Sequence, residues 1–250
     1  MREVPKSIND CELTFLSRRL IDVDRARLEH AQYVALLASL DVQVRYLPPL
    51  PASPDSVFVE DTALVLDEIA IIMRPGASIR RAEVETTAEA LRPFRKIEHL
   101  QAPATLDGGA LIVVDRQIFV GATSRSNEAG AVGLQAIVAE HGYLVRTIEI
   151  TDCLHLKSAA TAIGDSAVLL NPAWVDPASF GDVDVVEVDP SEPEAANAVR
   201  IGDDLIHAAE FPRTRLRLEQ AGYSVHSVPA GELAKAEGAV TCCSLVFVAG

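Results

Sequence analysis

The sequence predicts a single α/β domain, residues 1–250, in which five similar modules form a ring around a central cavity. Three observations predict this fold. A pattern of β-rich run, polar turn, β-rich run, polar loop and amphipathic stretch recurs along the chain. Its turns are spaced 38 to 49 residues apart, and the two chain ends together supply the parts of one more module. Such a period is typical of repeat architectures, in which each unit buries a face against its neighbours.

Four modules begin with two β-rich runs joined by a short polar turn. These runs cover residues 62–73, 110–121, 159–170 and 197–209, and the turns begin at Asp67, Asp115, Gly164 and Gly202. Gly142 is well placed to end the helix expected in the second module. The fourth module is irregular, so an ordinary open α/β sheet is the alternative fold.

The fifth module is expected from the two ends of the chain. Residues 22–40 are expected to form a helix with Leu28, Ala31, Ala35 and Leu37 on its apolar stripe. The strand-like residues 42–47 follow this helix, and the last strand-like stretch is GAVTCCSLVFV, residues 238–248. Joining the ends would close the ring and remove the exposed sheet edges of an open array.

Composition excludes several classes of function. The formal charge of −14 argues against nucleic-acid binding, which needs a basic surface. No apolar run approaches the length of a membrane span, and the first ten residues lack the apolar core of a signal peptide, so a cytoplasmic protein is expected. The four cysteines have no disulfide-framework or zinc-site spacing, and free thiols are expected.

Acidic residues stand at the heads of the first two modules. In PDSVFVED, Asp55, Glu60 and Asp61 bracket an apolar segment, and strand alternation would send Glu60 and Asp61 to opposite faces. In TLDGGALIVV, Asp107 precedes two glycines that allow close backbone approach. Each acid taken alone is equally well read as a solvated turn residue.

Basic residues occupy the equivalent loops that follow the hairpins. Arg80 lies in RPGASIRR after the first hairpin, and Arg125 lies in the matching loop of the second module. Equivalent loops fall on the same end of a ring, where two arginines could bind a carboxylate. Without further evidence, surface arginines at helix starts are the simpler reading.

A thiol and an imidazole occupy the corresponding positions of two other modules. His155, in LHLKS, opens the third module, and Cys242 lies in the last stretch. In a ring, these residues and the acids before the first strands of their modules would converge on one mouth of the central channel. An acid, a histidine and a cysteine form the arrangement of a thiol nucleophile with its general base. Core packing is the plainer reading for Cys242 alone.

The motifs together resemble one enzyme family. PDSVFVEDTALV, RPGASIRR, TLDGGALIVV, FVGATSRSNEAG, LHLKSAATAIG and GAVTCCSLVFV occur in the order found in dimethylarginine dimethylaminohydrolases. The resemblance runs from about Ile8 to the end of the chain and is thinnest between residues 171 and 200. It implies the pentein fold, a five-bladed α/β propeller of ββαβ modules around a central active-site channel.

The resemblance also implies a role for each motif residue. Cys242 would be the nucleophile, His155 the general acid/base, and Asp107 the acid that orients His155. Substrate-binding groups would be Asp55, Glu60, Asp61, Arg80, Arg125, the backbone carbonyl of Ala236 and, with a loose alignment, that of Ile8. Two positions depart from the family pattern: Ala110 replaces a second aspartate and Ala236 a larger aliphatic residue.

The implied activity is that of a cysteine hydrolase acting on a linear amidine C–N bond. It would convert Nω,Nω-dimethyl-L-arginine, and the monomethyl compound, to citrulline and an amine through a covalent intermediate on Cys242. No cofactor is expected, and zinc bound adventitiously at Cys242 and His155 would inhibit. The partner is the small substrate, without nucleic acid or membrane, and a homodimer is left open. The alternatives are arginine deiminase, an amidinotransferase or a non-catalytic binding protein of the same fold.

Overall fold

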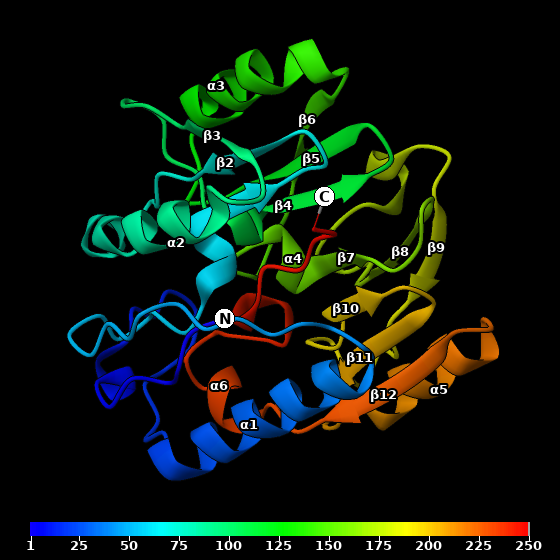
Figure 1. The fold of residues 1–250 in the computed structure, drawn as a ribbon. Helices are drawn as coiled ribbons and strands as arrows, with labels where there is room; N and C mark the ends of the chain where they lie inside the picture. The colour runs from blue at the N-terminus through cyan, green and yellow to red at the C-terminus, as the bar shows by residue number, and fades with distance from the viewer. Residues whose placement is uncertain (250) are drawn as a thin grey trace.

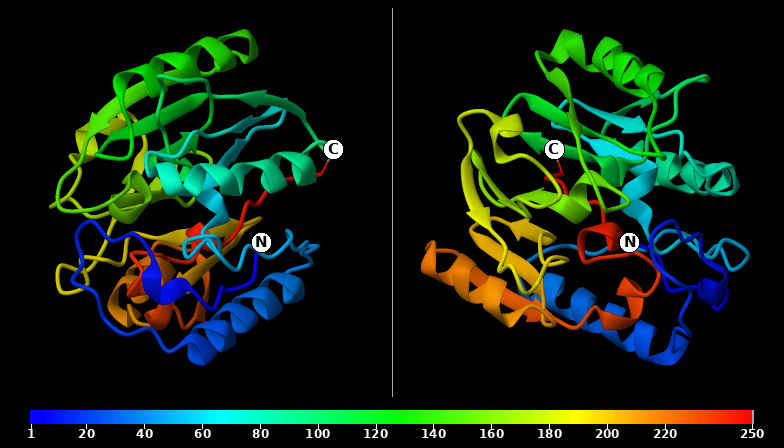
Figure 2. Two further views of the ribbon diagram at one scale, coloured as in Figure 1. Left: turned by 90° about the vertical axis from the view of Figure 1, so that its left-hand side faces the viewer. Right: turned by 180° about the vertical axis from the view of Figure 1, so that it is seen from behind.

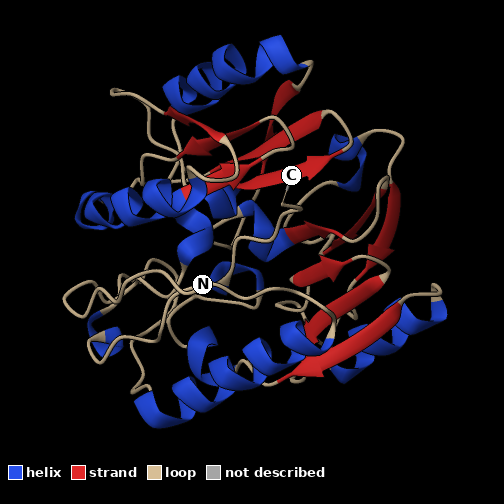
Figure 3. Ribbon diagram, viewed as in Figure 1, coloured by secondary structure: helices blue, strands red, loops and turns tan. Residues whose placement is uncertain are grey.

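The computed structural model describes residues 1–249 and contains four separate three-stranded sheets in this part of the chain. Within each sheet the first two strands are antiparallel, and the third is parallel to the second. Figure 1 shows the sheets radiating around the centre of the molecule, and Figure 3 shows the longer helices on the periphery. The predicted ββαβ topology is therefore confirmed for three modules, and the remaining module has the same strand arrangement with a 3₁₀ turn in place of the helix.

The elements of the four modules follow one another along the chain. The first module has β1 (Ala63–Val65), β2 (Ile69–Ile72), α2 (Val84–Leu91) and β3 (Lys96–His99). The second has β4 (Leu111–Val114), β5 (Gln117–Ala122), α3 (Glu128–Val138) and β6 (Leu144–Glu149). The third has α4 (Leu156–Ala159), β7 (Ala160–Ala162), β8 (Ala167–Leu170) and β9 (Asp184–Glu187), with a 3₁₀ turn in place of a long helix. The fourth has β10 (Ala198–Ile201), β11 (Asp204–Ala208), α5 (Pro212–Gln220) and β12 (Ser224–Val228).

The predicted turns lie between the paired strands of the hairpins. Asp115 and Gly202 have positive φ angles of 51° and 59°, as tight hairpin turns require. Gly142 has a φ of 78° and ends the helical segment after α3, as predicted. Turn-forming residues and the helix-ending glycine were therefore sufficient to predict where these turns lie.

Five hydrophobic cores join each module to the next around the ring. One core lies between the first and second modules, the next between the second and third, and another between the third and fourth. The remaining two involve the chain ends: one joins the fourth module to the N-terminal segment and Cys243, and the other joins Leu245 and Phe247 to the first module. The ends of the chain therefore close the ring, as predicted.

The fifth module differs from the prediction in its construction. Residues 42–47 and 244–248 are extended but form no hydrogen-bonded strand, and Thr241–Cys243 is a 3₁₀ turn. The C-terminal segment is instead held by packing: Phe247 stacks edge-on against Phe94, and Arg95 donates to the carbonyl of Val248. Figure 2 shows this red segment running past α2. The strand-like composition predicted strands here, but none of the strands within residues 1–249 pairs with these two segments.

The helix α1 (Val23–Ser39) buries only part of the predicted stripe. Leu37 is buried as predicted, but Leu28 is 59% exposed, and Ala31 and Ala35 are also exposed. Ala26 and Tyr33 are buried instead. The buried face also carries Glu29, whose carboxylate accepts the backbone N–H of Glu232 in α6 (Gly231–Ala234). A polar contact between the two helices thus overrides the apolar periodicity. Within residues 1–249, none of the helices has the length and apolarity needed to cross a membrane.

Candidate active site

The predicted imidazole, the predicted thiol and most of the predicted acids lie at one repeated position, in or directly before a short helical turn. These turns lead into the first strands of the first three modules: Val59–Thr62 before β1, Gly108–Ala110 before β4, and Leu156–Ala159 before β7. The turn Thr241–Cys243 takes the same place in the fifth module. The turn at Val59–Thr62 corrects the expectation of an extended strand, and both Glu60 and Asp61 are buried there. The two carboxylates still have different partners: Glu60 accepts from Lys157 and Thr241, whereas Asp61 pairs with Arg80.

His155 lies between two buried carboxylates from different modules. Its Nε2 is 3.0 Å from Oδ2 of Asp107, and its Nδ1 is 3.7 Å from Oδ1 of Asp61. The other Asp107 oxygen accepts the N–H of Gly76 at 2.8 Å, and Oδ1 of Asp61 accepts the N–H of Gly109 at 3.1 Å. Both acids are thus fixed by backbone donors, and the imidazole ring is fixed by the acids.

The charges around the imidazole favour its protonated form. Burial by itself would lower the pKa of His155, but Asp61 and then Asp107 outweigh burial and raise that pKa. Burial would likewise raise the pKa of Asp61, but His155 and Arg80 hold that pKa below its ordinary value. These charges therefore favour an ionised Asp61 and a protonated His155 in the resting site.

The two adjacent cysteines have different surroundings. Cys242 is partly exposed, and its Sγ accepts the N–H of Ala239 at 3.4 Å. Cys243 is buried in the core between the fourth module and the N-terminal segment. Burial, followed by the carboxylates of Glu60 and Asp61, raises the pKa of the Cys242 thiol well above its ordinary value. The resting thiol is therefore neutral, and a bound cation would favour its ionisation.

Arg80 lies in the site but is surrounded by protein acceptors. It is 4% exposed and forms ion pairs with Asp61 at 2.5 Å and with Glu83 at 3.0 Å. Its Nη2 also donates to the carbonyl of Phe58 at 3.0 Å. The charge of Arg80 helps to keep Asp61 ionised. Glu83, the second partner of Arg80, was not predicted, because it belongs to no recognisable motif.

Arg125 lies beside the first-module loop, as the equivalence of the two loops predicted. A Cβ on Gly76 would lie 2.6 Å from the carbonyl oxygen of Arg125, so this glycine allows the loops to touch. The Arg125 side chain is buried, and its Nη2 lies 3.3 Å from Oγ1 of Thr14. Asp55 is also buried, and its Oδ2 accepts the N–H of Glu12 at 3.2 Å. The segment around residues 12–16 therefore contacts both.

Ile8 and Ala236 are both buried in the core beside the fifth module. The carbonyl of Ile8 accepts the N–H of Cys11 at 3.1 Å within a 3₁₀ turn. Next to Ala236, Glu237 adopts a positive φ of 58°, and its carboxylate accepts the N–H groups of residues 14, 15 and 16 at 2.6 to 3.0 Å. Glu237 was missed, because no local pattern links it to a segment more than 200 residues away.

Two more residues near the site escaped the sequence analysis. Thr241, next to the predicted nucleophile, donates through Oγ1 to Oε2 of Glu60 at 2.7 Å. Asn197 directly precedes β10, the place that Thr62, Ala110 and Ala159 take before the first strands of their modules. Its side chain donates to Oγ1 of Thr241, a contact that no local pattern signals.

Metal-ligand atoms also gather in the site. Among residues 1–249, the donor atoms of Asp61, Asp107 and His155 lie within 4.8 Å of one another. All three are already engaged, in the Asp107–His155 hydrogen bond and the Asp61–Arg80 ion pair. Cys242 is not a member of this group, so inhibitory zinc on Cys242 and His155 stays a prediction.

Comparison with known proteins identifies the family. The family model described as N,N dimethylarginine dimethylhydrolase, eukaryotic, matches residues 6–174. The N(G),N(G)-dimethylarginine dimethylaminohydrolase of Pseudomonas aeruginosa is 35% identical over 228 residues, which is 90% of each chain. The chain belongs to the dimethylarginine dimethylaminohydrolase family. The enzyme of that name from Streptomyces coelicolor is also 35% identical, over 93% of this chain and 90% of its own.

Solved structures of dimethylarginine dimethylaminohydrolase agree with this fold. The Pseudomonas aeruginosa enzyme, as a cysteine-to-serine mutant complexed with citrulline, superposes with a TM-score of 0.93 at 33% identity and covers 98% of this chain and 97% of its own. The N-terminal domain of an arginine dihydrolase and an amidinotransferase of saxitoxin biosynthesis each superpose with a TM-score of 0.79, at 21% and 17% identity. These two more distant likenesses show the shared fold alone.

Proposed function

We propose that this protein hydrolyses Nω,Nω-dimethyl-L-arginine, and Nω-monomethyl-L-arginine, to L-citrulline and the corresponding methylamine. The observation that carries this proposal is the placement of His155 between Asp107 and Asp61, with the carboxylates of Glu60 and Asp61 acting on the Cys242 thiol. A buried pair of acids beside a neutral thiol suits a cationic substrate whose central carbon is attacked by sulfur.

The acids would bind the guanidinium group of the substrate. Glu60 and Asp61 are 6% and 3% exposed, so their charges are poorly screened by water. A guanidinium held there would offset the field that raises the pKa of Cys242, and the thiol would lose its proton on binding. The substrate therefore activates its own nucleophile.

The first half of the reaction would form a covalent intermediate. The Cys242 thiolate attacks the central guanidinium carbon and gives a tetrahedral adduct. His155, hydrogen-bonded through Nε2 to Asp107, gives its Nδ1 proton to the dimethylamine nitrogen. The C–N bond breaks, dimethylamine leaves, and an S-alkylthiouronium remains on Cys242.

The second half would release the product by hydrolysis. His155, now neutral, takes a proton from water through Nδ1, and the oxygen attacks the thiouronium carbon. Collapse breaks the C–S bond, the hydroxyl proton of the adduct passes to the departing sulfur, and citrulline and the Cys242 thiol result. Each step uses groups of this chain and water, so no cofactor is assigned a role.

The amino-acid end of the substrate would lie toward the segment around residues 12–16. Arg125 is the candidate for the α-carboxylate, and Asp55 and the carbonyl of Ala236 are candidates for the α-amine. Support comes from the contacts of Thr14 with Arg125 and of Glu12 with Asp55. The roles of Arg80 and Ile8 in substrate binding are part of the same proposal, although Arg80 pairs with Asp61 and Glu83 here.

The proposal is tested by incubating the protein with dimethylarginine, monomethylarginine and arginine. Citrulline and the released amine are measured separately, and the Cys242→Ser protein is the control. We expect equimolar citrulline and dimethylamine from dimethylarginine, with none from the variant. Citrulline and ammonia from arginine in preference to the methylated compounds would instead indicate an arginine deiminase.

A further inference from the structure

A closed ring of hydrogen bonds joins four modules at the base of the site. Nζ of Lys157 donates to Oε1 of Glu60 at 2.5 Å, and Oγ1 of Thr241 donates to Oε2 of Glu60 at 2.7 Å. Asn197 closes the ring, since its Nδ2 donates to Oγ1 of Thr241 at 2.9 Å and to the carbonyl of Lys157 at 3.0 Å. Four residues from four modules thus hold one another in place.

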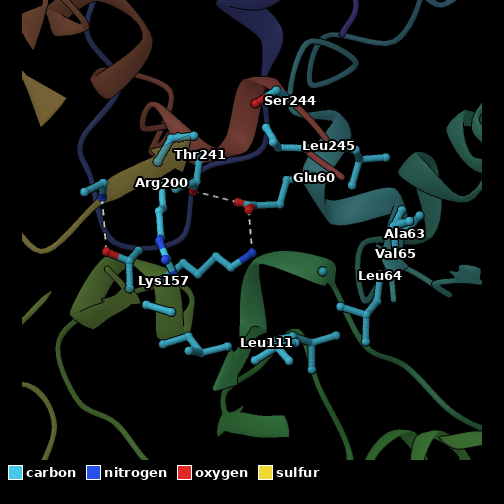
Figure 4. A pocket seen from close by; sticks show the side chains of 18 residues that line it. Glu60, Ala63, Leu64, Val65, Leu111, Lys157, Arg200, Thr241, Ser244 and Leu245 are labelled. Carbon is cyan, nitrogen blue, oxygen red and sulfur yellow. Dashed lines mark hydrogen bonds and ion pairs between the residues drawn. The ribbon is translucent and has the colours of Figure 1, made fainter. Parts of the chain in front are cut away.

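Lys157 reaches Glu60 from a chamber of the central channel. This cavity of about 240 Å³ is lined by the innermost segments of all five modules, including residues 63–65, 111–113 and 244–246. Glu60, Lys157 and Thr241 line it, whereas His155, Asp107 and Cys242 are not among its lining residues. Figure 4 shows the Lys157 side chain extended to the Glu60 carboxylate, with Thr241 on the other oxygen.

We propose that Lys157 is a positioning residue that holds the Glu60 carboxylate in the orientation that binds the substrate cation. The inference rests on the proposed function, in which Glu60 binds the guanidinium. Lys157 and Thr241 each use one carboxylate oxygen of Glu60 and fix the plane of the group. A carboxylate oxygen has a second lone pair, so each can still accept from a guanidinium N–H.

The charge of Lys157 matters because Glu60 is buried beside another acid. The Glu60 side chain is 8% exposed, and Asp61 already has Arg80 as its cation. Removal of the Lys157 ammonium leaves Oε1 of Glu60 without its charged partner, so the buried carboxylate is no longer held in one orientation. A Glu60 carboxylate turned out of place would bind a guanidinium weakly.

A purely structural role for Lys157 predicts a different result. If the ion pair only holds modules together, its loss should slow every reaction of Cys242 alike. If Lys157 acts through Glu60, its loss should slow reactions with cationic reagents more than reactions with neutral ones. The two readings are separated by comparing 2-chloroacetamidine, a cation, with iodoacetamide, a neutral molecule. In both reactions the Cys242 thiolate displaces halide and forms a thioether.

The experiment measures both alkylation rates at Cys242 by peptide mass spectrometry. Lys157→Met removes the charge at similar volume, and Lys157→Arg keeps it. Lys96→Met is the matched control, because Lys96 pairs at 2.8 Å with Glu98 on the exposed strand β3. In Lys157→Met we expect the ratio of the cationic to the neutral rate to fall about tenfold, as for a lost charged hydrogen bond. The other two variants should stay near the wild-type ratio.

Three outcomes would overturn the role of Lys157: an unchanged ratio in Lys157→Met, an equal fall of both rates, or a Lys157→Arg ratio as low as that of Lys157→Met. The alkylation ratio needs no turnover. If the wild-type protein prefers the cationic reagent and loses the preference in Lys157→Met, but releases no citrulline from dimethylarginine, the proposed substrate is wrong and the positioning role stands. In an active enzyme, Lys157→Met should also raise KM for dimethylarginine more than it lowers kcat.

Discussion

Gly109 is the position where a single added methyl group should disable the site. A Cβ at residue 109 would lie 2.7 Å from Oδ1 of Asp61 and 2.8 Å from Nδ1 of His155. Ordinary contact begins at 3.4 Å, so these two groups would have to retreat by 0.7 and 0.6 Å. Both are held from behind, Asp61 by Arg80 and His155 by Asp107. Neither can retreat without weakening its ion pair.

Gly109→Ala should therefore lower kcat for dimethylarginine about 100-fold, the usual cost of misplacing reacting groups by close to an ångström. Destabilisation from overpacking should stay at about 1–3 kcal/mol, so the protein still folds. Steady-state citrulline release and thermal unfolding measure the two effects. The control is Gly133→Ala in α3, whose Cβ would meet only the tip of Leu100 at 3.1 Å and which gains about 1 kcal/mol of helix propensity. A Gly109→Ala kcat within a few-fold of wild type would refute this steric reasoning.

Three further predictions concern the thiols and the N-terminal segment. Because its pKa is raised, the Cys242 thiol should alkylate with iodoacetamide at a rate that still rises at about pH 9, beyond the ordinary thiol range; a plateau near neutral pH contradicts this. Cys243→Ser should keep kcat within a few-fold and lower the melting temperature slightly, since Cys243 is a core residue; loss of citrulline release at normal folding would argue against that. Glu237→Ala should raise KM and speed proteolysis near residues 14–16, which lose their acceptor. Glu194→Ala should change neither, because Glu194 is exposed on the rim of a second cavity, which Glu237 also lines.

The sequence predicted the site best where a reactive type of residue lies at the same position in successive modules. Asp107 and His155 could be placed together because each directly precedes the short turn that leads into the first strand of its module, and a ring brings equivalent positions to one mouth. The same logic does not reach Asn197, which lies directly before β10 without such a turn. In a repeat fold, the position of a residue within its module therefore predicts where that residue lies in the structure.

The features that sequence could not supply depend on tertiary partners. Strand alternation separated Glu60 from Asp61, because nothing local signals the 3₁₀ turn that buries both. Arg80 looked free for a substrate carboxylate, yet it pairs with Asp61, which lies 19 residues earlier and is brought to it by the fold. The strands predicted at the two chain ends did not form for a related reason. An extended segment becomes a strand only when a neighbouring strand lies within hydrogen-bonding reach.

The covalent role of Cys242 is tested most directly by stopping turnover of dimethylarginine with acid and locating the adduct by peptide mass spectrometry. We predict an amidine-linked adduct on Cys242 alone, retained in Cys243→Ser and absent in Cys242→Ser. An adduct on Cys243, or citrulline release by the Cys242→Ser protein, would contradict the assignment of the nucleophile and the mechanism built on it.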